Sequence, residues 1–98
     1  MNKNLSEMIE YPKQGILSKS IFKTGGLEIT LFCMAAGTKI SEHTSTKKGI
    51  IQVIEGKGNF CLEEKNIEMK SNVLIYMKEN AIHSLKAEKN TSFILTLI

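Results

Sequence analysis

Apolar and polar residues alternate along most of the chain after its first dozen residues. In LEITLFC (27–33), leucine, isoleucine and cysteine share one parity, and Glu28 and Thr30 begin the other. A period of two is typical of a β-strand, because successive side chains point to opposite faces. Gly25 and Gly26 stand just before this strand, and a Gly-Gly turn predicts a hairpin with the preceding segment, ILSKSIFK (16–23).

Short apolar segments recur through the rest of the chain at close and regular spacing. They span residues 49–56, 59–64, 67–71, 73–77, 81–87 and 92–98. Every separator contains Gly or Asn, which tolerate the left-handed backbone of tight turns. Many short strands joined in this way predict an all-β fold, an antiparallel sandwich or barrel of which the jelly roll is the variant with two packed sheets.

The N-terminal segment NLSEMIEY (4–11) is the one stretch that could form a helix. Ser6 could cap a short helix there, and an edge strand is the alternative. A chain of 98 residues has the size of one compact domain with one core. We therefore expect a single domain over 1–98.

Composition narrows the classes of partner. All 13 basic residues are lysines, so the chain lacks the arginine side chains that recognise phosphate and guanine through two parallel hydrogen bonds. We therefore expect no nucleic-acid partner. All ten acidic residues are glutamates, which removes an Asp-oriented catalytic histidine. No apolar run is long enough for a membrane span, so we expect a cytoplasmic protein with no membrane partner. Cys33 and Cys61 are expected to act as small hydrophobes.

The middle of the chain carries a recognisable spacing of glycine and histidine. Gly37, His43, Ser45, Gly49 and Gly56 fall on the fixed positions of the pattern G(X)5HXH(X)3-4E(X)6G. This pattern is the first motif of the cupin superfamily, and the chain resembles its small, conserved-barrel type. Serine stands here at the second histidine position, and glycine stands at the glutamate position.

The second cupin motif, G(X)5PXG(X)2H(X)3N, is matched more weakly. Only His83 agrees with it, and the other fixed positions hold Asn72, Lys78, Asn80 and Ala87. Fifteen residues, 57–71, separate the two motifs, as in small microbial cupins. The resemblance covers residues 27–98. It implies a cupin barrel over that range, with residues 1–26 forming an N-terminal segment and first strand that pack on the barrel or on a partner.

The resemblance also implies a barrel interior that often holds a divalent metal bound by three histidines and a glutamate. This chain keeps two of the four ligands, His43 and His83. Catalytic zinc normally has three protein ligands, and non-heme iron has two histidines and a carboxylate. The two imidazoles could therefore hold zinc, iron, manganese or nickel only weakly, unless water or a bound ligand completed the shell.

Strand parity predicts which side chains accompany the histidines. Glu42 neighbours His43 and is expected to point outward, so it cannot serve as the missing carboxylate. Counting in twos places Ser45, Ile51 and Val53 on the face of His43, and Leu85 on the face of His83. Ile75 and Met77 from the segment before His83 could complete an uncharged pocket lining beside them.

The same parity turns Ile50 and Ile54 outward, although a solvated face would normally be polar. A second sheet or the N-terminal segment could cover them. Exposed apolar patches also mark association surfaces, and the resemblance implies a dimer, so we expect a homodimer.

Two functions fit these residues. In the first, the barrel binds a small molecule in an apolar pocket, with His43, Ser45 and His83 as its few orienting polar groups. In the alternative, the protein is a metal-dependent cupin enzyme of the dioxygenase or isomerase type that uses His43 and His83. A purely structural role is a third interpretation. The sequence identifies no catalytic residue and no substrate.

Overall fold

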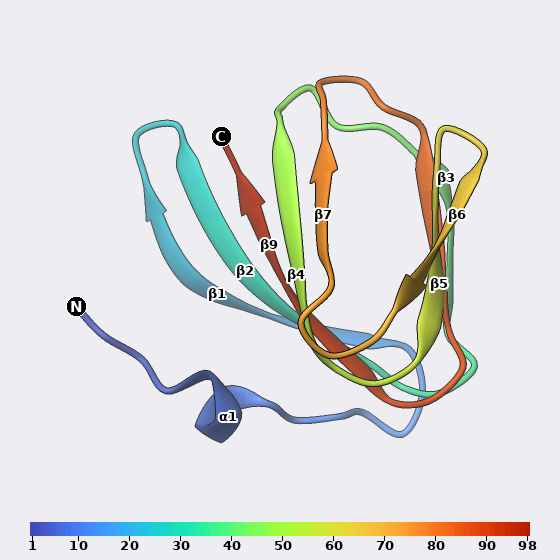
Figure 1. Cartoon of the computed structure of the whole chain (residues 1–98). Coiled ribbons are helices and arrows are strands. Elements are labelled where there is room, and N and C mark those ends of the chain that lie inside the picture. Colours follow the sequence, from blue (N-terminus) through green and yellow to red (C-terminus); the bar gives the residue numbers. More distant parts are fainter.

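The computed structural model describes all 98 residues and contains one short helix and nine strands (Figure 1). The elements are α1 (Leu5–Met8), β1 (Ile16–Thr24), β2 (Leu27–Met34), β3 (Lys39–His43), β4 (Gly49–Glu55), β5 (Gly58–Leu62), β6 (Lys65–Met69), β7 (Leu74–Met77), β8 (His83–Ala87) and β9 (Thr91–Leu97). The chain contains no helix of the length and apolar character that crossing a membrane requires.

The strands form two antiparallel sheets that face each other, which confirms the predicted all-β jelly roll. One sheet has five strands in the order β1-β2-β9-β4-β7, and the other has four in the order β3-β8-β5-β6. Figure 1 shows the four-stranded sheet on the right, with the β1–β2 hairpin leaning away from it at the upper left. The predicted Gly-Gly hairpin is present, since Thr24 pairs with Leu27 across the turn.

Two asparagines replace glycines at turns of the second cupin motif. Asn72 has φ 72° and Asn80 has φ 63°, and both positions correspond to glycine in the motif. Asparagine is one of the few side chains that adopts this left-handed region readily. At these two positions the chain therefore adopts a backbone conformation that glycine also favours.

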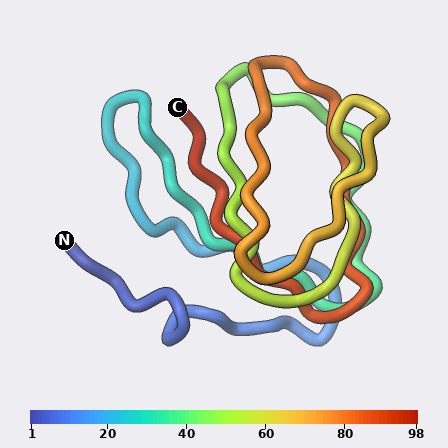
Figure 2. The backbone as a smooth tube through the Cα atoms, viewed as in Figure 1, coloured from blue at the N-terminus to red at the C-terminus, as the bar shows by residue number.

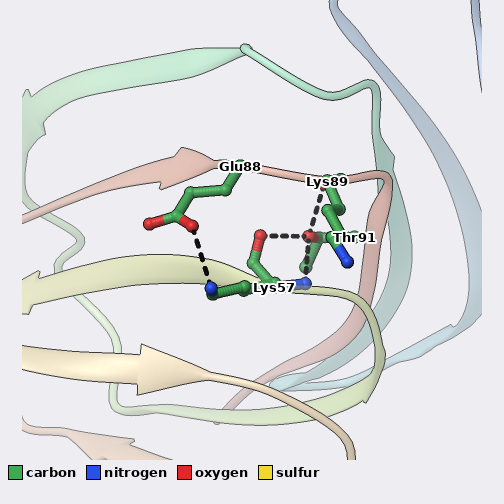
Figure 3. Close-up of polar contacts among 4 residues, drawn as sticks. All are labelled: Lys57, Glu88, Lys89 and Thr91. Atoms are coloured by element: carbon green, nitrogen blue, oxygen red, sulfur yellow. Dashed lines mark hydrogen bonds and ion pairs between the residues drawn. The ribbon is translucent and has the colours of Figure 1, made fainter.

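The base of the barrel is tied together where β4 passes into β5 beside the start of β9 (Figure 3). A Cβ added at Gly56 would lie 2.5 Å from Thr91 Cα, so only glycine allows this approach. Thr91 Oγ1 accepts a hydrogen bond from the Lys57 N–H at 3.2 Å and donates to the Lys89 carbonyl at 2.8 Å. Lys57 and Glu88 form an exposed ion pair beside it at 3.6 Å. These contacts join the two sheets at one end.

The main core lies between the sheets and fills the half of the barrel nearest this base. Met34, Phe60 and Met69 have no exposed surface, and Val53 and Ala87 are each 1% exposed. The parity expected for β4 is confirmed, because Ile51 and Val53 are buried while Gln52 between them is exposed.

A smaller core lies on the outer face of the five-stranded sheet, where Leu31, Cys33 and Ile94 are buried. The N-terminal segment covers it through Leu5, Met8, Ile9 and Tyr11, and Ile54 packs against the same cluster. Figure 2 shows this segment running outside the barrel. Ile54 is therefore covered by the N-terminal segment and not by the second sheet, which faces the other side.

The N-terminal segment forms a helical turn and not an edge strand. Its N-cap is Asn4, two residues before the predicted Ser6, and no side chain caps the turn. Polar contacts attach the segment to the sheet, among them an ion pair between Lys19 Nζ and Glu10 Oε1 at 3.1 Å. Lys19 Nζ donates to the Met8 carbonyl at 2.9 Å, and the Tyr11 hydroxyl donates to Glu55 Oε2 at 3.0 Å.

Candidate functional site

The two histidines of the chain meet at the open end of the barrel. His43 ends β3, His83 begins β8, and the two residues are paired across these strands. Their ring centroids are 4.0 Å apart, and the ring planes are inclined by 59°. The register shifts between Ile40 and His43, so a β-bulge brings His43 opposite His83.

Backbone carbonyls orient both rings in the same way. His43 Nδ1 lies 2.8 Å from the carbonyl oxygen of Ser41, and His83 Nδ1 lies 2.9 Å from that of Ala81. A carbonyl can only accept, so we assign the proton of each neutral ring to Nδ1. Each Nε2 atom then carries a lone pair, and neither makes a hydrogen bond with another protein group.

A hollow of about 110 Å³ lies beside the histidine pair. It is lined by His43 and His83 together with eight apolar residues, namely Phe32, Ile40, Ile51, Phe60, Met77, Leu85, Phe93 and Leu95. His83 is 6% exposed, whereas His43 is exposed at the rim. His43 thus lies at the solvent-exposed opening of the hollow, and His83 lies inside it.

Aromatic rings form much of the wall. Phe60 stacks on His83 with centroids 5.8 Å apart and planes inclined by 12°. Phe32 and Phe93 stack on each other at 5.2 Å. These contacts hold the His83 ring between Phe60 on one side and His43 on the other.

Burial lowers the pKa of His83, and the neighbouring charge of His43 lowers it further, while the hydrogen bond to the Ala81 carbonyl acts in the opposite direction. Removing an imidazolium from water disfavours its charged form. His83 is therefore neutral near pH 7 and can accept a hydrogen bond at Nε2.

The predicted pocket-lining residues divide into two groups. Ile51, Met77 and Leu85 line the hollow beside the histidines. Val53 and Ile75 face the interior as expected but lie outside the lining, because they belong to the packed core. Ser45 also lies outside it. Its side-chain oxygen accepts the Lys47 N–H at 3.2 Å, and its carbonyl accepts the Asn80 N–H at 2.7 Å.

Sequence reasoning missed five lining residues, namely Phe32, Ile40, Phe60, Phe93 and Leu95. The parity of LEITLFC drew attention to Leu31 and Cys33, yet that face lies under the N-terminal segment. Strand β2 packs against apolar residues on both faces, and Phe32, which is half-buried, lines the hollow from the other face. Phe60 could have been found by pairing, because it lies opposite Leu85.

The donor atoms do not fit a resident divalent metal. No three histidine, cysteine or glutamate side chains come together anywhere in the chain, so the two imidazoles have no protein partner for such an ion. At the glutamate position of the motif stands Gly49, and a Cβ there would lie only 2.8 Å from Met77 Cε. The methyl group of Met77 thus occupies the space beside the position where the motif has its glutamate, and the two imidazoles fall short of the three ligands of catalytic zinc.

Comparisons with known proteins identify the fold. No protein-family model matches the chain, and no curated protein sequence matches it. Among solved structures, it is similar to a cupin 2 conserved barrel domain protein from Leptotrichia buccalis, with 25% identity and a TM-score of 0.90 over 98% of this chain and 47% of that one.

Two further structures agree. A cupin superfamily protein from Desulfitobacterium hafniense has 17% identity and a TM-score of 0.89 over 96% of this chain and 86% of that one. Salicylate 1,2-dioxygenase from Pseudoaminobacter salicylatoxidans has 15% identity and a TM-score of 0.80 over 95% of this chain and 28% of that one. The two facing antiparallel sheets, the motif turns and these neighbours together identify the chain as a small single-domain barrel with the cupin fold.

Proposed function

We propose that this protein binds a small molecule in the hollow beside His43 and His83. The observation that carries the proposal is the pair of imidazole Nε2 atoms, neither of which makes a hydrogen bond with the protein. Both imidazoles line a hollow whose other eight lining residues are apolar. Ligand sites commonly combine an apolar wall with a few convergent polar groups that fix the ligand's orientation.

The size of the hollow limits the ligand. A dry cavity of about 150 Å³ is large enough to bind benzene. The enclosed space here is about 110 Å³, and it opens at His43, which is exposed. Because this volume is smaller than that of the benzene cavity, one small ring would lie partly inside and project through the opening, whereas a short branched aliphatic body would lie inside.

The alternative, a metal-dependent enzyme of the dioxygenase or isomerase type, receives less support. The salicylate dioxygenase is similar to this chain at 15% identity, a level that speaks for a common fold alone. Non-heme iron oxygenases hold their metal with two histidines and a carboxylate. Here the carboxylate position is Gly49, and Met77 occupies the space beside it.

A matched pair of substitutions tests the binding site. Leu95 lines the hollow, whereas the next residue, Thr96, lies on the opposite face of β9. In an NMR screen of single-ring fragments, wild type and Thr96→Trp should bind the same compounds, and Leu95→Trp should lose them because the indole fills the hollow. If fragments that bind wild type bind Leu95→Trp equally well, the site lies elsewhere.

A further inference from the structure

We infer that the ligand of this hollow is an uncharged molecule that presents a hydroxyl or N–H donor to His83 from a small apolar body. This inference rests on the proposed function and specifies the chemistry of the same site. The inference depends on which hydrogen-bond acceptors, hydrogen-bond donors and charged groups the lining residues present to the hollow.

The lining offers acceptors and no free donors. Both Nδ1 protons are used on the carbonyls of Ser41 and Ala81, which leaves the two Nε2 lone pairs. The other eight lining residues have apolar side chains. A ligand that can only accept, such as an ether or a ketone, would therefore find no partner in the hollow.

Charged ligands are disfavoured for a related reason. The lining contains no lysine and no glutamate, and burial keeps the enclosed His83 in its neutral form, so neither an anion nor an ammonium would meet an opposite charge inside the hollow. An unpaired charge in an apolar environment is expensive, and in practice such a group is excluded or neutralised. The hollow should therefore reject carboxylates of the same size as a neutral ligand.

His83 is the residue that makes the donor necessary. It is 6% exposed and stacked on Phe60, so a ligand that fills the hollow removes the remaining water from its Nε2. An acceptor left without a donor in this way weakens binding by roughly 10- to 100-fold. His43 is exposed, and water can still donate to its Nε2 when the hollow is occupied.

Three single-ring compounds of similar size test the inference. Phenol supplies the donor, toluene lacks it, and benzoate carries a charge. Each would be titrated into the full chain at pH 7.5 and followed through its backbone amide signals. We expect wild type to bind phenol at least about 10-fold more tightly than toluene, and benzoate more weakly than either.

The substitution His83→Phe keeps an aromatic ring against Phe60 and removes the acceptor, so phenol and toluene should bind it equally. Ser84→Ala is the matched control, because Ser84 follows His83 on β8 with its side chain on the opposite face, and it should retain the preference. In wild type, the Nε2 nitrogen signal of His83 should move on phenol binding and stay in place with toluene, a readout that needs no substitution.

Equal binding of phenol and toluene to wild type, or tightest binding of benzoate, would overturn the inference while leaving a small-molecule site in the hollow. Perturbation of no hollow residue by any of the three compounds would overturn the proposed function itself.

Discussion

Met77 fills the space beside Gly49. The two residues are paired across β7 and β4, and an ideal Cβ at position 49 would lie 2.8 Å from Met77 Cε and 3.4 Å from a methyl group of Leu97. The cupin motif places a metal-binding glutamate at this position. The combination of a glycine and a facing methionine therefore replaces a carboxylate by an apolar methyl group.

Restoring the motif's glutamate should create a metal site. We predict that Gly49→Glu and Met77→Ala together give stoichiometric Zn²⁺ binding by isothermal titration calorimetry, because three protein ligands then replace two. Untagged wild type should contain no stoichiometric metal by elemental analysis. The double variant with His83→Ala added is the control and should bind far more weakly. Tight binding of one Zn²⁺ per wild-type chain would show that the two imidazoles hold a metal without a carboxylate.

Truncating Phe60 should strongly destabilise the barrel. Phe60 has no exposed surface and packs in the main core and on His83. Replacing a buried phenylalanine by alanine removes contacts and leaves a cavity, at a cost of about 3–5 kcal/mol. We expect Phe60→Ala to lower the free energy of unfolding in urea by that amount, and Phe60→Leu to lower it by less. A loss under about 1 kcal/mol for Phe60→Ala would show that this core is loosely packed.

Acidification should destabilise the protein through His83. Its pKa in the folded state is lowered, chiefly by burial, from the ordinary value of 6.5. Below pH 6.5 the unfolded chain therefore binds more protons than the folded chain at this residue, and stability falls as the pH drops toward the folded-state pKa. We expect this loss in urea unfolding measured between pH 7.5 and 5.

The substitution His83→Phe should remove that part of the pH dependence, whereas His43→Phe should retain most of it, because burial is the larger cause of the shift. Identical pH profiles for wild type and His83→Phe would assign the effect to other groups.

Tyr11 anchors the N-terminal segment. Its hydroxyl donates to Glu55 Oε2 at 3.0 Å, and burial, which is the largest cause, raises its pKa from 10.0 to about 12. We predict that Tyr11→Phe lowers the free energy of unfolding by about 1 kcal/mol. In wild type this contribution should persist up to pH 10 and be lost as the pH rises toward 12, because the unfolded tyrosine ionises first. An unchanged unfolding midpoint for Tyr11→Phe at pH 7 would show that the bond does not hold the segment.

A homodimer stays a prediction, and its surface can now be specified. With Ile54 covered, the remaining outward apolar residues of this region are Ile50, which is half-buried, and its neighbours on the edge strand β7, Leu74 and Tyr76, which are 67% and 58% exposed. We propose that a second copy of the chain covers them. Sedimentation should then show a dimer for wild type and a monomer for Tyr76→Lys. The control Ile82→Lys changes an exposed apolar residue elsewhere and should remain dimeric. A wild-type monomer at every concentration would refute the proposal.

The fold could be predicted because its signals are local. Alternating parity located the strands, the Gly-Gly turn located the hairpin, and the motif spacing located both histidines. The Asn72 and Asn80 turns look like departures from the motif, yet both residues adopt the backbone conformation that glycine would have.

The lining of the hollow was harder to predict, because parity reports which face a residue occupies and not how far along the barrel it lies. Val53 and Ile75 have the expected inward parity but lie in the packed core. Ser45 precedes β4 in the connection from β3, where alternation no longer applies, and its side-chain oxygen accepts a backbone N–H. The position of Met77 over Gly49 depends on a pairing between strands about thirty residues apart, which alternation within one strand does not report.

The tied and filled base of the barrel has a kinetic consequence. Since Gly56 and Thr91 join the sheets there and large side chains occupy the adjoining space, the hollow exchanges with bulk solvent at the opposite end, which carries the exposed imidazole. A molecule that enters or leaves the hollow should therefore pass His43, so bulk added at that residue should slow both its association and its dissociation.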